Sequence, residues 1–73
     1  MKKFTLWEVP AVNGEIVEPA KPQKTVFTCE DDKEKKWYYT HCRKHKLHTA
    51  ISRFFVTEKE AYAEIGMALT NKQ

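Results

Sequence analysis

Cysteine is scarce in this sequence of 73 residues, and long apolar runs are absent from it. The two cysteines, Cys29 and Cys42, are too few for a disulfide scaffold. No apolar stretch approaches the roughly 20 residues of a membrane-spanning helix, and no apolar segment follows the lysines at positions 2 and 3. We therefore expect a cytoplasmic protein with reduced thiols and no membrane contact.

The length leaves room for one small core. A chain of 73 residues buries about 60% of its unfolded surface, and it has little volume for a substrate pocket of roughly 300 Å³. Hydrophobic residues make up 41% of the chain and aromatic residues 12%, whereas disordered chains are poor in both. The composition predicts one folded domain over residues 1–73 that is not an enzyme.

The order of segments predicts an α+β fold, in which a small antiparallel sheet of about four to five short strands packs against one C-terminal helix. Aromatic and β-branched residues favour the strands. Pro10 is expected to end the first strand, and Asn13-Gly14 predicts a tight hairpin turn. The charged residues 30–35 are expected to form the loop of a second hairpin, over residues 24–42. The expected strands lie near residues 3–9, 15–17, 24–29, 36–42 and 49–56.

The C-terminal helix has the clearest signal. Thr57 and Glu60 have the spacing of a capping box, and good helix formers follow, so a helix is expected near residues 58–70. Tyr62, Ile65 and Leu69 would form an apolar stripe that packs on the sheet. Gly66 within this helix predicts a close approach to a bulky residue of the sheet, or has no structural role.

Positive charge is concentrated in the middle of the chain. The net charge is +3, yet residues 33–53 hold seven Lys and Arg against Glu34 alone. Such an asymmetry indicates either a solvated face or an anionic partner. Basic groups alternate with aromatic ones here, which suits nucleic acid, because cations neutralise phosphates and rings stack on exposed bases.

The candidate binding residues come from this stretch. The set is Lys35, Lys36, Trp37, Tyr39, Arg43, Lys44, Lys46 and Arg53, with Lys33 and Tyr38 beside them. In a strand at 36–42, Trp37 and Tyr39 would share one face. They could stack on bases, or they could pack in the core while the lysines stay solvated.

A metal site is a further hypothesis, because Cys29, His41, Cys42, His45 and His48 are all zinc-ligand types. A regular hairpin over 24–42 would hold the two cysteines about 20 Å apart. It would leave Cys42, His45 and His48 as three ligands that lack a fourth, unless a second copy supplies it. The simpler interpretation is that these histidines are hydrogen-bonding surface residues and that no cofactor is bound.

Catalysis by Cys42 has weak support. Arg43 and Lys44 would lower the pKa of its thiol, and His45 or His48 could act as base. No acidic residue is at hand to orient that base, and no segment suggests an oxyanion site.

These observations favour a small non-enzymatic protein that binds nucleic acid, or an acidic surface of a nucleic-acid-handling protein, through residues 33–53. In size and charge the chain resembles the small accessory proteins of phages and other mobile elements. That resemblance implies an alternative, in which the chain inhibits or regulates a host protein by direct contact. A zinc-stapled domain is the second alternative, and the oligomeric state stays open.

Overall fold

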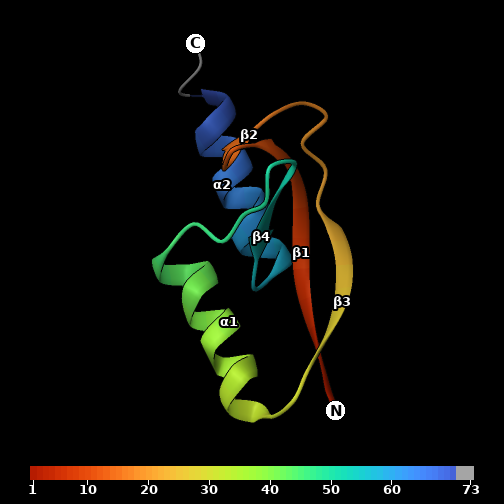
Figure 1. Cartoon of the computed structure of the whole chain (residues 1–73). Helices are drawn as coiled ribbons and strands as arrows, with labels where there is room; N and C mark the ends of the chain where they lie inside the picture. The colour runs from red at the N-terminus through yellow and green to blue at the C-terminus, as the bar shows by residue number, and fades with distance from the viewer. Residues whose placement is uncertain (71–73) are drawn as a thin grey trace.

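The computed structural model describes the backbone of residues 1–70 and the side chains of residues 1–68. The elements, in chain order (Figure 1), are β1 (Lys2–Val12), β2 (Glu15–Ile16), β3 (Gln23–Cys29), α1 (Asp32–Lys44), β4 (Ser52–Phe55) and α2 (Glu58–Thr70). The α+β class, the antiparallel sheet and the C-terminal helix are confirmed. A second helix, α1, stands where a strand was expected. Within residues 1–70, neither helix has the length and apolar character needed to cross a membrane.

Strand β1 is the centre of the sheet and pairs antiparallel with each of the other three strands. Trp7 and Glu8 lie opposite residues of both β3 and β4, so those strands flank β1 on opposite edges. Figure 1 shows the same order, with β1 between β3 and β4. The hairpin predicted over residues 24–42 is therefore wrong, because β3 pairs with β1 instead.

The turn between β1 and β2 is the one expected from Asn13-Gly14. Both residues have positive φ, 51° and 87°, as a two-residue hairpin turn of this type requires. Strand β1 does not end at Pro10 but continues to Val12. Proline is tolerated because β3 has already ended beside it, and its carbonyl oxygen accepts a hydrogen bond from the Val17 N–H at 3.2 Å.

Alternation along β1 creates two apolar clusters, one on each face of the sheet. The even-numbered Phe4 and Leu6 lie with Cys29 in the α1-side cluster, which side chains of α1 complete. The odd-numbered Val9 lies in the α2-side cluster, which is formed by Val9, Ile16, Phe55, Ala61 and Ile65. The helices consequently cover opposite faces of β1.

Strand β4 is shorter than the stretch 49–56 predicted for it, because residues before Ser52 form a turn. The Thr49 side-chain oxygen accepts hydrogen bonds from the N–H groups of Ile51 and Ser52, at 3.3 and 3.1 Å. Both faces of β4 are covered, because Phe54 packs in the α1-side cluster and Phe55 in the α2-side cluster.

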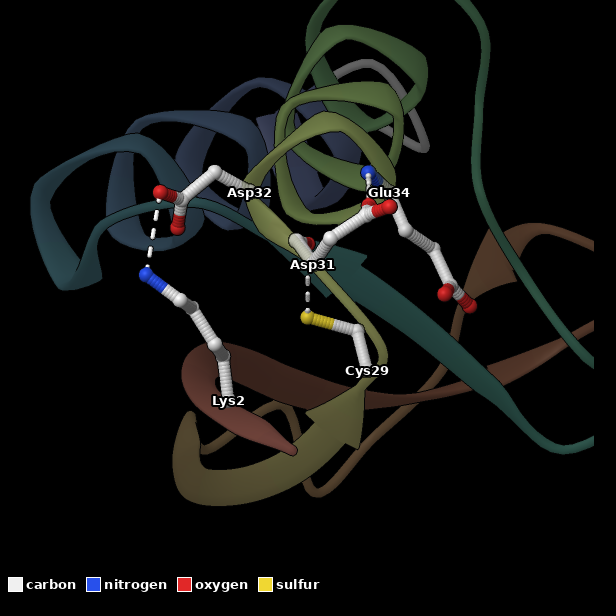
Figure 2. Close-up of polar contacts among 5 residues, drawn as sticks. All are labelled: Lys2, Cys29, Asp31, Asp32 and Glu34. Carbon is white, nitrogen blue, oxygen red and sulfur yellow. Dashed lines mark hydrogen bonds and ion pairs between the residues drawn. The ribbon is translucent and has the colours of Figure 1, made fainter.

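The predicted strand at 36–42 is wrong, and the start of α1 shows why (Figure 2). Asp31 is the N-cap, and its carboxylate accepts a hydrogen bond from the Glu34 N–H at 2.9 Å. The Glu34 carboxylate reaches back to the Glu30 N–H at 3.1 Å. Nearby, Lys2 forms an ion pair with Asp32 at 3.0 Å, which ties the start of β1 to the start of α1. The charged segment read as a hairpin loop is thus a helix start.

In α2, the apolar stripe is narrower than expected. Ala61 and Ile65 are buried, but Tyr62 is 54% exposed. The side chain of Leu69 lies outside the described residues.

Candidate functional site

One face of α1 carries exposed cations around an exposed tryptophan. Lys33, Lys36, Trp37, Thr40 and Lys44 recur at helical spacing, so they line a single side of the helix; we call this set the basic stripe. All five are exposed. Its three lysines make no ion pair within residues 1–70. The stripe is therefore a positively charged surface with no internal counter-ion.

Trp37 is held in place by ring contacts within α1. Its indole stacks on the His41 imidazole with ring centroids 3.8 Å apart, and His41 in turn lies 5.0 Å from the His45 ring. The Tyr38 ring meets the indole edge-on at 5.0 Å. Trp37 nevertheless stays 50% exposed. A large aromatic side chain is thus both oriented and open to solvent, and does not pack in the core.

Tyr39, unlike Trp37, packs against the sheet. With Tyr38 and Cys42, it lies on the side of α1 that packs on the sheet. Its ring meets Phe4 edge-on at a centroid distance of 6.0 Å, and the Lys35 ammonium lies over the Tyr39 ring, 5.8 Å from its centroid. Tyr39 therefore belongs mainly to the α1-side cluster, and the two aromatic candidates are divided between surface and core.

The two arginines among the candidates are engaged in ion pairs. Arg43 is exposed and lies 3.2 Å from a carboxylate oxygen of Glu60, so its charge is partly offset. Arg53 is only 11% exposed at its side chain, and it lies 3.0 Å from Glu64. Its guanidinium also sits over the Phe55 ring. Arg53 is therefore a mostly buried cation that is paired with Glu64, and it is not part of the basic stripe.

A shallow hollow of about 310 Å³ lies beside the basic stripe. Its lining residues are Lys36, Tyr39, Thr40, Arg43 and Lys44, four of which belong to the set expected from the sequence. Lys46 is exposed in the segment after α1. The helix thus gathers Lys36, Arg43 and Lys44 around one concave surface that could accept an anionic group.

Cys42 has the environment of an inert thiol. It is half-buried in the α1-side cluster, and this burial raises the pKa of its thiol to about 11, with Glu60 adding to the shift and Arg43 opposing it. A thiol with such a pKa is protonated near neutral pH, so it is a poor nucleophile. The arginine neighbour expected to activate Cys42 is outweighed by desolvation.

The two cysteines lie near opposite ends of α1, Cys29 just before its N-cap and Cys42 close to its last residue, and both contribute to the α1-side cluster. Both are free thiols, and the buried Cys29 thiol donates to the Asp31 carbonyl oxygen at 3.3 Å (Figure 2).

The histidines do not assemble a metal site. Among the residues that the structure describes, no three His, Cys, Asp or Glu side chains are grouped so that they could hold a metal ion. His45 ends α1 as its C-cap, and the His48 ring contacts the Gly14 turn. Cys42, by contrast, faces the sheet. The three proposed zinc ligands therefore have three separate surroundings.

Sequence reasoning named most of these residues but not their arrangement. Thr40 was overlooked, and Lys33 was left at the margin, because the alternation of a strand does not group them with Trp37 and Lys44. The available helical signal was a spacing of three, four and eleven residues from Lys33, which leads to Lys36, Trp37 and Lys44. Comparisons of the chain with protein-family models, with curated proteins and with solved structures found no match.

Proposed function

We propose that this protein binds nucleic acid through the basic stripe of α1 and does not act by catalysis. The observation that carries the proposal is the position of Trp37, an ordered and exposed aromatic side chain between lysines that have no internal ion pair. Lysines that neutralise phosphates, beside a ring that stacks on a base, form the usual combination for single-stranded nucleic acid.

The dimensions of the stripe suit a short run of phosphates. At the rise of an α-helix, the distance from Lys33 to Lys44 is about 16 Å. That is the length of about five nucleotides along one strand of a duplex. Three lysines over this length can each approach a different phosphate, while Arg43 adds a fourth cation once it leaves Glu60.

Fluorescence anisotropy with single-stranded DNA, duplex DNA and RNA tests the proposal. If the three lysines contact phosphates, affinity for a single strand falls about 20-fold between about 50 and 200 mM salt, and affinity for a duplex falls about 40-fold. In the double variant Lys36→Gln with Lys44→Gln, only one such contact remains, and the same change in salt costs about fourfold or less. Trp37→Ala weakens single-strand binding by about 1–3 kcal/mol and leaves duplex binding nearly unchanged.

A matched control removes the same charge elsewhere. Lys3 and Lys59 are exposed residues of β1 and α2 that do not belong to the basic stripe. The double variant Lys3→Gln with Lys59→Gln should retain the salt dependence of the unaltered protein. No binding at low salt, or an equal loss in this control, would contradict the proposal and direct attention to an acidic protein surface.

A protein partner is the second candidate, and an apolar hollow favours it. This hollow, of about 230 Å³, is lined by Phe4, Leu6, Phe27, Thr28, Tyr38, Leu47, His48, Thr49 and Phe54. Aromatic-lined hollows accept apolar anchor side chains of partner proteins. A partner captured by the protein should be lost on Leu47→Lys and kept on Trp37→Ala, whereas the reverse result would assign it to the basic stripe.

A further inference from the structure

Strand β3 has an open edge. Within residues 1–70 its only partner strand is β1, and its seven residues contain no proline and form an unbroken register with Lys2–Glu8. Figure 1 shows it as the outermost strand on its side of the sheet. By contrast, the outer edge of β4 is covered, because Phe54 donates its N–H to the Leu47 carbonyl oxygen at 3.0 Å. An uncovered regular edge is a template for pairing with another strand.

The pairing of β1 with β3 and β4 determines which β3 residues direct their N–H and C=O groups toward the open edge. Ala11 donates its N–H to the Ile51 carbonyl oxygen on the β4 side. The backbone N–H and C=O groups of odd-numbered β1 residues therefore point toward β4, and those of even-numbered residues point toward β3. The even-numbered residues pair with Gln23, Thr25, Phe27 and Cys29. The N–H and C=O groups of Lys24, Val26 and Thr28 therefore point outward.

We propose that β3 pairs antiparallel with β3 of a second copy of this chain, with Val26 at the two-fold axis. In this register Val26 lies opposite its own counterpart, and Lys24 lies opposite Thr28 of the second copy. Each of these residues directs its backbone groups outward, so all three N–H and C=O pairs on each edge find partners. A register shifted by one residue would set outward groups against inward ones.

Charge and side chains favour a second copy in this orientation. Lys21 and Lys24 lie at the start of the edge, and Glu30 and Asp31 follow its end. Antiparallel pairing brings the basic end of one copy to the acidic end of the other, whereas parallel pairing would bring like charges together. Val26, which is 58% exposed and belongs to neither apolar cluster, would be covered by its counterpart.

The dimer would join the two sheets into one. Side chains directly opposite in an antiparallel pair lie on the same face, so both α1 helices would cover one face of the joined sheet. The two basic stripes would then lie on one side of the assembly. The pairing itself depends on the β3 edge alone and does not require the proposed function.

Sedimentation velocity of the full chain, up to about 1 mM, tests this pairing. The unaltered protein and Val26→Thr, which keeps a β-branched side chain, should double in mass as concentration rises. Val26→Lys should remain monomeric, because it sets two ammonium groups against each other at the axis. Circular dichroism checks that the lysine variant keeps its fold, which the exposed position of residue 26 favours.

Amide hydrogen exchange of the unaltered protein locates the interface without any substitution. The amides of Lys24, Val26 and Thr28 should exchange more slowly at high concentration than at low concentration, while the amides of the exposed Glu58 and Lys59 at the start of α2 should not change. A protein that stays monomeric at the highest concentration would overturn the proposal. So would a dimer that survives Val26→Lys, or one that leaves these three amides unprotected. Nucleic-acid binding by monomeric Val26→Lys is measured separately, so the two proposals can fail independently.

Discussion

Gly14 and Gly66 have opposite surroundings, one in the turn between β1 and β2 and the other within α2. Gly14 has a φ of 87°, and a Cβ added there would lie 3.0 Å from Cδ2 of the His48 ring. Gly66 lies in α2 with ordinary helical geometry, and a Cβ there would meet nothing within 4 Å. The close approach predicted for Gly66 is therefore wrong, and the close approach in this structure is at Gly14.

Alanine at these two positions should change stability in opposite directions. Gly14→Ala should lower the free energy of unfolding by about 1–2 kcal/mol, because a side chain is disfavoured at positive φ. Gly66→Ala should raise it by about 1 kcal/mol, because alanine is the better helix former and finds open space. Urea unfolding of both variants provides the measurement. Gly14→Ala combined with His48→Ala separates the ring contact from the φ cost, since only the contact disappears.

At the scale of elements, α1 depends on its N-terminal cap more than a buried helix would. It contains no fully buried residue and packs on the sheet through half-buried side chains such as Tyr38 and Tyr39. Acidic residues occupy its first turn and basic ones its last, which suits the helix dipole. Because this packing is only partial, the cap and the charges at its ends should add measurably to its stability.

Removing the cap should weaken α1 measurably. Asp31→Ala eliminates the acceptor for the Glu34 N–H and should cost about 1 kcal/mol of unfolding free energy, whereas Asp31→Asn keeps an acceptor and should cost much less. Thermal unfolding followed by circular dichroism compares the two. An equal loss in both variants would mean that the negative charge, and not the hydrogen bond, stabilises the helix start.

At the scale of the whole molecule, β1 couples the two apolar clusters. It supplies Phe4 and Leu6 to one cluster and Val9 to the other, so the two clusters share this central strand. The two tryptophans report on the two sides, because Trp7 packs against the α2-side cluster and Trp37 stands on α1. A shared central strand predicts that both sides unfold together.

Single-tryptophan variants test this coupling. Trp7→Phe leaves a reporter on α1, and Trp37→Phe leaves one beside the α2-side cluster. Each can be combined with Leu6→Ala, which should lower the unfolding free energy by about 2–5 kcal/mol. Both reporters should then detect an equal loss, although Leu6 contacts only the α1-side cluster. A loss seen by Trp37 alone would indicate two independently unfolding parts.

The sequence alone was sufficient for the features that depend on local chemistry. Asn13-Gly14 specifies a turn with positive φ at both residues, and Thr57 caps α2 through the Glu60 N–H at 3.1 Å. The apolar pair Phe54 and Phe55 predicts a strand covered on both faces. The concentration of cations in the middle of the chain also follows from the sequence, because charged residues can be counted without any knowledge of the fold.

Tertiary structure decided which residues share a surface. Residues 36–42 have strand-like side chains, yet packing of Tyr38, Tyr39 and Cys42 on the sheet, with a cap at Asp31, favours the helix. That change of period from two to 3.6 turns Tyr39 toward the α1-side cluster and leaves Trp37 exposed beside the lysines. Exposure, ion pairing and the open edge of β3 depend on contacts between segments distant in the chain, and local patterns do not encode those contacts.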